Sequence, residues 1–156
     1  METVEKRQYR NIFAEIGIPS TKIESRLEEI RQTFFYDEKE RLYYPVGEDM
    51  AYIVDTGNMD VRTEGMSYGM MLCVQLDMKE EFDRLWKWAK TFMWMEEGYN
   101  EGYFAWSCAL DGSKNADGPA PDGEEFFAMA LFFASHRWGD SEGIFQYSKE
   151  AKTLLS

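Results

Sequence analysis

Residues 60–78 read DVRTEGMSYGMMLCVQLDM, and this stretch indicates the fold class of the chain. From Thr63 onward, apolar side chains recur at helical spacing, as in Met66, Met70 and Val74. Further apolar side chains lie between these positions, so the apolar surface of the segment is wide. The stretch therefore predicts a helix that begins after a loop and is largely buried.

Four other segments show helical periodicity. Their apolar positions are Ile23, Leu27, Ile30 and Phe34 for residues 21–35, Phe82 to Met93 for a helix that continues to Gly98, the run from Phe126 to Phe133 for a helix that begins at Asp122, and Ile144, Tyr147, Ala151 and Leu154 for residues 140–155. The stretches between them are loops with at most a short strand pair around Tyr43 and Tyr52. Without strong strand alternation elsewhere, the sequence predicts an all-α fold.

The charge of the chain excludes some partners. The chain carries 29 Asp and Glu against 17 Lys and Arg, a formal net charge of -12, which would repel nucleic acids and anionic lipid surfaces. No apolar run is long enough to span a membrane, and the charged start has no apolar signal segment. We therefore expect a cytoplasmic protein that binds neither nucleic acid nor membrane.

Aromatic residues make up 16% of the chain. A core rich in rings is the simpler explanation, and an aromatic cleft that binds sugar rings is the alternative. Cys73 and Cys108 each lie in an apolar stretch, which favours buried reduced thiols over a disulfide or a metal site. His136 is the only histidine, which excludes multi-histidine metal sites and favours a structural role.

Glu64 is a carboxylate at a loop-to-helix junction. Thr63 could cap this helix while Glu64 only complements the helix dipole, which is a common arrangement without function. The catalytic acid of a glycosidase must instead stay protonated near neutral pH, whereas a helix N-terminus and Arg62 both favour the ionised form. Burial beside residues such as Tyr68, or a second carboxylate nearby, could oppose them. A catalytic Glu64 should therefore be partly buried, with another acid close by.

A second helix start, residues 118–127 (GPAPDGEEFF), carries three carboxylates. Asp122 and Glu125 have the spacing of a capping box, and Glu124 could simply be solvated. Two helix starts that each bear an acid could nevertheless face one cleft if consecutive helical hairpins form a ring. Trp106 lies between them in sequence and is a candidate stacking platform for a sugar, although most Trp residues belong to a core.

Residues 60–71 and 119–140 resemble the corresponding stretches of glycoside hydrolase family 8. They are closest to the members of that family that release xylose from the reducing end of oligosaccharides. The resemblance implies an (α/α)6 barrel of twelve helices, an inverting mechanism, and neither a metal nor an organic cofactor. Residues 1–156 would then be the N-terminal portion of a single catalytic domain, with about five to six of the twelve helices.

The resemblance also implies roles for individual residues. Glu64 matches the general acid that protonates the leaving oxygen, and Asp122 matches the acid that holds the sugar beside the cleavage point. Trp106 matches a stacking residue of the glycone side, with Arg62 and Tyr68 as further substrate-binding residues. The family's general base is an Asp far downstream, without a counterpart in this chain. A xylo-oligosaccharide is therefore the expected substrate, and the isolated chain should show very weak or no hydrolysis.

Other hypotheses stay open. The parent could instead be a family 8 endo-glucanase, xylanase or chitosanase, because residues that close or open the cleft ends lie partly downstream. A non-catalytic carbohydrate-binding or assembly module would keep the cleft without the chemistry, and a generic helical interaction protein would bind no saccharide. The apolar Leu154 and Leu155 at the end, without a C-cap glycine, suggest a missing neighbour. An exposed half-barrel face that self-associates is therefore a further expectation.

Overall fold

The computed structural model describes residues 9–156, which form two compact units. The smaller unit ends at Arg41, and the larger one runs from Leu42 to Ser156. The larger unit contains all five residues for which the sequence suggests a role in a site. No helix in the described part of the chain is long and apolar enough to cross a membrane.

The smaller unit is helical, with α1 (Ile12–Glu15), α2 (Ser20–Arg31) and a π-helical turn (Gln32–Tyr36). The helix predicted over residues 21–35 is confirmed, but its last turn is wider than an α-helical turn. Ile23 of the expected apolar face is buried, whereas Leu27 and Phe34 are exposed and Phe35 is buried in place of Phe34. A π turn holds more residues than an α turn, so the α-helical period no longer predicts which side chain is buried.

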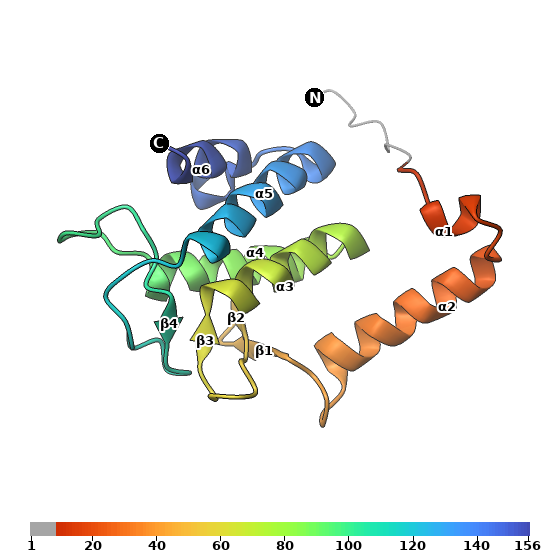
Figure 1. Ribbon diagram of the computed structural model, residues 1–156, viewed down its shortest axis with the longest axis horizontal. Coiled ribbons are helices and arrows are strands. Elements are labelled where there is room, and N and C mark those ends of the chain that lie inside the picture. The colour runs from red at the N-terminus through yellow and green to blue at the C-terminus, as the bar shows by residue number, and fades with distance from the viewer. Residues whose placement is uncertain (1–8) are drawn as a thin grey trace. The chain divides into compact units, whose positions relative to one another are not determined.

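The larger unit is dominated by helices, as Figure 1 shows. Its helical elements are α3 (Thr63–Leu76), α4 (Lys79–Trp88), a π-helical turn (Ala89–Met93), α5 (Pro121–Trp138), a 3-10 turn (Gly143–Phe145) and α6 (Tyr147–Leu154). α3 packs against α4 and α5, and α5 packs against α6. The predicted helices are present, but two bounds differ. The third helix ends earlier, at Met93, because Trp94 is extended and pairs with Phe104, and the last begins later, at Tyr147.

The structure also contains two small antiparallel sheets. β1 (Tyr43–Val46) pairs with β2 (Met50–Ile53), which confirms the strand pair expected in this loop. β3 (Val61–Arg62) pairs with β4 (Ser107–Cys108). The sequence does not predict this second sheet, because strands of two residues are too short to show alternation. The fold is mainly helical, as expected.

The core of the larger unit is aromatic. Trp86 of α4, Phe127 of α5 and Phe104 are fully buried, and their ring centroids lie between 5.1 and 5.8 Å apart. These three rings therefore belong to the core, which was the simpler explanation of the aromatic content. Cys73 and Cys108 are buried free thiols, as predicted, and burial raises the pKa of Cys108 to about 11.

Part of the surface of α3 and α5 is apolar. Leu72 of α3 is 40% exposed, and Met129 and Phe133 of α5 are 42% and 43% exposed. Leu155 is 65% exposed. These side chains agree with the expected exposed apolar face, while self-association through that face stays a prediction.

Candidate active site

The first turns of α3 and α5 are in direct contact, and Figure 1 shows these two helices side by side. A Cβ atom on Gly123 would lie 2.4 Å from Oγ1 and 3.0 Å from the backbone carbonyl carbon of Thr63, so only glycine permits this approach. Glu64 directly follows Thr63 in the sequence, and Asp122 directly precedes Gly123. The crossing therefore brings the two acid-bearing helix starts together.

Tyr68 links the two carboxylates. Desolvation raises the pKa of its hydroxyl, and so do the charge of Glu64, a hydrogen bond with Glu64 and the charge of Asp122. The ring of Tyr68 packs edge-on against Phe126, with the two centroids 4.8 Å apart. Because Tyr68 is 41% exposed, this polar group of two acids and a phenol lies at the surface of the larger unit.

Glu64 itself is exposed, so the expectation of a partly buried side chain is wrong for the described chain. The reason is its position on the helix. Glu64, Tyr68 and Leu72 are spaced by four residues and share one exposed side of α3, whereas Met66 and Met70 are fully buried. For the other half of the expectation, an acid close by, Asp122 is the candidate, because its charge and that of Glu64 both act on the Tyr68 hydroxyl.

The start of α3 is joined to a backbone group rather than to a capping side chain. Arg62 is the N-cap and makes no side-chain cap hydrogen bond, so Thr63 does not have the capping role that the sequence suggested. The N–H of Thr63 instead donates to the carbonyl of Trp106 at 3.0 Å. The helix that carries the candidate acid is thus tied directly to the candidate stacking residue.

Asp122 does not cap α5 either. The helix begins with Pro121, and Ala120 occupies the N-cap without a side-chain cap hydrogen bond. Proline suits the first helical position because its missing N–H would have no partner there. Asp122 Oδ1 accepts from the N–H of the next residue, Gly123, at 2.9 Å, and Asp122 is exposed. The expected capping box with Glu125 is therefore wrong.

Trp106 lies at the surface and is 39% exposed. The guanidinium carbon of Arg62 lies 5.3 Å from the centroid of the indole, which is a cation–π contact. The backbone N–H of Trp106 donates to the carbonyl of Gly118 at 3.0 Å, and the backbone carbonyl of Trp106 accepts from the N–H of Thr63. An exposed ring with a supported face and two fixed backbone groups is suited to stacking on a ligand.

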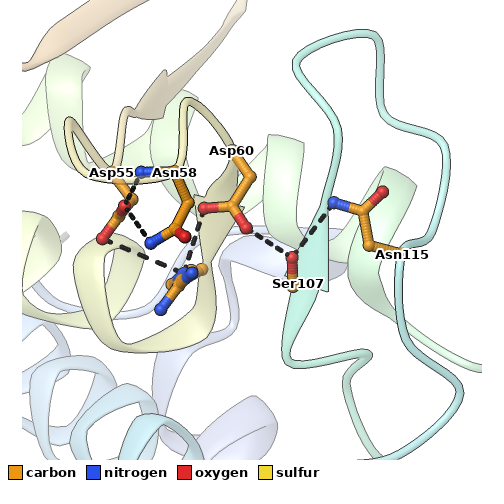
Figure 2. Close-up of polar contacts among 6 residues, drawn as sticks. Asp55, Asn58, Asp60, Ser107 and Asn115 are labelled. Atoms are coloured by element: carbon orange, nitrogen blue, oxygen red, sulfur yellow. Dashed lines mark hydrogen bonds and ion pairs between the residues drawn. The ribbon is translucent and has the colours of Figure 1, made fainter.

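Arg62 belongs to a polar network, and Figure 2 labels the acidic, hydroxyl and amide residues of that network. Asp60 Oδ1 accepts from Arg62 Nε at 3.0 Å, and Asp60 Oδ2 accepts from Ser107 Oγ at 2.9 Å. Asn115 Nδ2 donates to the same Ser107 Oγ at 3.1 Å, and Asp55 Oδ2 lies 3.8 Å from Arg62 Nε. Sequence reasoning missed Asp60 and Ser107, because only the pairing of β3 with β4 brings them together.

Glu124 is partly buried, so the expectation that it is simply solvated is wrong. Its Oε1 accepts from the N–H of Phe104 at 2.8 Å. Burial raises the pKa of Glu124, and the hydrogen bond from Phe104 opposes this. Glu124 therefore joins the first turn of α5 to the segment that leads to Trp106.

The arrangement can interact with a ligand in two ways, through its carboxylates and through an aromatic ring. The exposed carboxylates of Glu64 and Asp122 could exchange a proton or accept hydrogen bonds from hydroxyl groups, and the exposed ring of Trp106 could stack on a sugar face. Residues 9–156 contain no group of three or more His, Cys, Asp or Glu side chains placed to hold a metal ion. His136 lies in the last turn of α5, at the end of the helix opposite Asp122.

Comparison with known proteins identifies the family. Residues 47–155 match the model of glycosyl hydrolases family 8, and the chain belongs to this family. The chain is 57% identical over 151 residues to the reducing end xylose-releasing exo-oligoxylanase of Halalkalibacterium halodurans, and 55% identical over 148 residues to Rex8A, an exo-oligoxylanase of Paenibacillus barcinonensis. It spans 39% of the length of each of these relatives. It is also 34% identical over 105 residues to endoglucanase A of Acetivibrio thermocellus.

Solved structures support the same assignment. A crystal structure of a reducing end xylose-releasing exo-oligoxylanase matches with a TM-score of 0.89 at 60% identity, over 94% of this chain and 39% of that one. Similar enzymes solved with xylose, and as a variant with xylobiose, match with TM-scores of 0.88 at 57% and 56% identity. The chain thus forms part of the (α/α)6 barrel that this family adopts.

Proposed function

We propose that this chain supplies the general acid and part of the sugar-binding surface of an inverting glycosidase. The whole enzyme acts on β-1,4-linked xylo-oligosaccharides and releases xylose from their reducing end. The observation that carries the proposal is the contact between Gly123 and Thr63, because it brings together the two helix starts that carry the exposed residues Glu64 and Asp122.

Each residue of the proposed site has a separate task. Glu64 donates its proton to the leaving oxygen of the glycosidic bond, and Tyr68 orients the Glu64 carboxyl through their hydrogen bond. Asp122 accepts hydrogen bonds from hydroxyl groups of the sugar beside the cleaved bond. Trp106 stacks on a sugar ring of the glycone side, and Arg62 supports the indole. These tasks need neither a metal nor an organic cofactor.

The proposed mechanism requires a second catalytic carboxylate. An inverting glycosidase places its general base on the opposite face of the sugar from the acid, about 6.5–9.5 Å away, so that a water fits between them. We do not assign this task to Asp122, because the resemblance gives it the role of holding the sugar beside the cleaved bond. We therefore assign the base to the part of the barrel that this chain does not span, and we expect the isolated chain to hydrolyse xylotriose very weakly or not at all.

The same part of the barrel would also complete the surroundings of Glu64. A glycosidase acid works best out of bulk water, whereas Glu64 is exposed in the described chain. Tyr68 and Leu72, on the same side of α3, are exposed as well. Helices packed over this side would remove all three side chains from water together.

The relatives support a xylo-oligosaccharide as the substrate. Identity to two reducing-end xylose-releasing enzymes is 57% and 55%, whereas identity to endoglucanase A is 34% over a shorter stretch. Two of the matching crystal structures were solved with xylose and xylobiose. A family 8 enzyme for longer glucans is therefore the less supported alternative.

A chimera tests the proposal directly. In it, this chain replaces the matching segment of the Halalkalibacterium halodurans relative, which supplies the rest of the barrel. The chimera should release xylose from xylotriose, and Glu64→Gln should lower its kcat by about 10²- to 10⁴-fold, the usual contribution of a general acid. Xylobiose binding, measured by Trp fluorescence, should persist in the Gln variant.

Glu80→Gln is the matched control. Glu80 also lies in the first turn of a helix, α4, and its side chain is 75% exposed. This variant should keep full activity. A folded chimera without activity, or an active one in which Glu64→Gln retains turnover, would refute the assignment of the acid. A chimera that cleaves cellotriose faster than xylotriose would refute the substrate.

A further inference from the structure

Trp106 needs support that its own segment does not supply. The residue directly precedes the two-residue strand β4, and its ring is 39% exposed, so two side-chain torsions set the direction of the indole. The two backbone hydrogen bonds of Trp106 hold the main chain but not these torsions. The ring contact with Arg62 can help to fix the plane of the indole.

We propose that Asp60 is the positioning residue of Trp106. This inference rests on the proposed role of Trp106 as a platform for a sugar ring. Asp60 holds Arg62 against the indole through one carboxylate oxygen, and it holds Ser107, the next residue after Trp106, through the other. The two contacts come from the two strands of one small sheet, so Asp60 joins both sides of the platform.

The geometry of Asp60 fits this task. Its side chain is 13% exposed, and the side chain of Arg62 is 28% exposed. Hydrogen bonds to a carboxylate in such surroundings are stronger than those between neutral groups. The hydrogen bond to Asp60 is also the largest cause of the raised pKa of Arg62.

Asp55, the other acid near Arg62, is less suited to the same task. Its Oδ2 lies 3.8 Å from Arg62 Nε, beyond hydrogen-bond distance, and its side chain is 32% exposed. Its Oδ1 is occupied by Asn58, whose backbone N–H and Nδ2 donate at 2.7 and 3.0 Å. Asp55 therefore shapes its own turn, and Asp60 supplies the directed contact with Arg62.

Asn115 extends the network from the other side. Its Nδ2 donates to Ser107 Oγ at 3.1 Å, and its backbone N–H donates to the Ser107 carbonyl at 3.0 Å. The Ser107 hydroxyl can then direct its single proton to Asp60 Oδ2. The loop after β4 is thereby fixed to the same carboxylate that fixes Arg62.

The placement of Asp60 predicts an effect on binding rather than on proton transfer. Both of its oxygens accept hydrogen bonds, from Arg62 and Ser107, and its side chain is only 13% exposed, so the carboxylate lacks the access to substrate that a general base needs. The hydrogen bond from Thr63 to the Trp106 carbonyl does not involve Asp60 and should survive its substitution. Loss of Asp60 should therefore disturb the indole and leave the start of α3 in place.

The first test measures the indole itself. The chain contains five Trp residues, so incorporation of 5-fluorotryptophan gives five fluorine resonances, and Trp106→Phe identifies that of Trp106. Asp60→Asn should shift and broaden the Trp106 resonance and leave the other four unchanged. Ser107→Ala, which removes the hydrogen bonds of the hydroxyl with Asp60 and Asn115 but leaves the contact of Asp60 with Arg62, should shift the same resonance by less.

Asp111→Asn is the matched control for this measurement. Asp111 lies in the same loop-rich region. Its Oδ1 accepts hydrogen bonds from the backbone N–H of Ser113 at 2.9 Å and from Ser113 Oγ at 2.6 Å, both within one turn. The control should leave all five resonances in place. A Trp106 resonance that is unchanged in both Asp60→Asn and Ser107→Ala overturns the inference. If Asp60→Asn unfolds the chain and all five resonances move, the Trp106 resonance of Ser107→Ala decides whether the inference stands.

The second test uses the chimera with the Halalkalibacterium halodurans relative. Asp60→Asn should raise KM for xylotriose on the order of fivefold, the factor expected for loss of an exposed cation–π contact, and change kcat less than twofold. A fall in kcat with KM unchanged overturns the inference, because Asp60 would then act in the chemistry. A shifted Trp106 resonance without a change in KM supports the positioning role and refutes the proposed platform role of Trp106.

Discussion

The two ends of helices α3 and α5 use their acidic residues in different ways. At the N-terminal ends, Glu64 and Asp122 are exposed, and the charges of both act on the hydroxyl of Tyr68. At the other end, Asp77 accepts hydrogen bonds from Arg137 Nε at 3.0 Å and from Trp138 Nε1 at 2.7 Å, which ties the end of α3 to the end of α5. The carboxylate at the far end joins helices, whereas those at the near end stay accessible to a ligand. The difference separates the part of the molecule proposed for binding from the part that holds it together.

The largest effect should come from closing the approach of the two helix starts. In Gly123→Ala the new Cβ would meet Thr63 at 2.4 Å, so the helices must separate and the free energy of unfolding should fall by about 2 kcal/mol. Gly65→Ala is the matched control, because Gly65 also lies in a first turn and its Cβ would meet Ile53 at an ordinary 3.7 Å. That change should stabilise the chain by up to about 1 kcal/mol through helix propensity. Urea unfolding measures both, and equal effects would contradict the role of the crossing.

The second largest effect should be a loss of ligand binding when the exposed ring of Trp106 is removed. Trp106→Ala in the chimera should weaken xylobiose binding by about threefold to tenfold, the range expected for loss of an aromatic contact. Stability should change little, because the ring is 39% exposed and lies outside the fully buried core. Calorimetric titration with xylobiose measures the affinity. Unchanged affinity, or a large loss of stability, would mean that Trp106 belongs to the core and not to the site.

At the C-terminal ends of α3 and α5, a substitution should lower stability and leave turnover nearly unchanged. Asp77 has a left-handed backbone conformation, with φ of 61°, which Asn also tolerates. Asp77→Asn should lower stability by about 0.5–1 kcal/mol, since it weakens the hydrogen bonds from Arg137 and Trp138, and the 56% exposure of the Asp77 side chain limits the loss. Turnover of the chimera should stay within twofold of the parent. A larger fall in turnover would remove the distinction between the two ends.

The smallest effect concerns Glu124, which lies at the site end but has a structural contact. Burial raises the pKa of Glu124 above its ordinary value, so the folded chain binds this proton more tightly than the unfolded chain does. The contribution of Glu124 to stability is therefore fully present below the unfolded pKa near 4.5 and is lost as pH rises through the folded pKa. Glu124→Gln keeps an acceptor for Phe104 and removes the buried charge. Its stability relative to the parent should be a few tenths of a kcal/mol greater at pH 7 than at pH 4, measured by urea unfolding at both values. A difference that is the same at both pH values would contradict the raised pKa.

Most of the helices could be predicted from the sequence, because a side of a helix that packs on a core must be apolar at a regular spacing. The prediction over residues 63–78 is confirmed by α3, in which Met66, Met70 and Val74 are buried. The pattern failed where the helix changes its turn, as at Phe34 and Phe35, because a π turn alters the period itself.

The helix starts could be located from the sequence, but their caps could not. Spacing alone suggested that Thr63 and Asp122 cap their helices, and both expectations are wrong. The N–H of Thr63 is bonded to Trp106, which is far away in the sequence. A cap from a distant backbone group leaves no local signal, so only the folded chain shows it.

The sequence by itself determined the class of the fold, the free buried cysteines and the family to which the chain belongs, because these depend on local periodicity and on motifs of adjacent residues. Only the tertiary structure decided that Gly123 lets the two helix starts touch, that Glu64 lies on an exposed side of α3, and that Asp60 holds Arg62 and Ser107 together. These features depend on contacts between residues that are far apart along the chain. Such contacts form when the helices and the short β3–β4 sheet pack, and no local pattern encodes them.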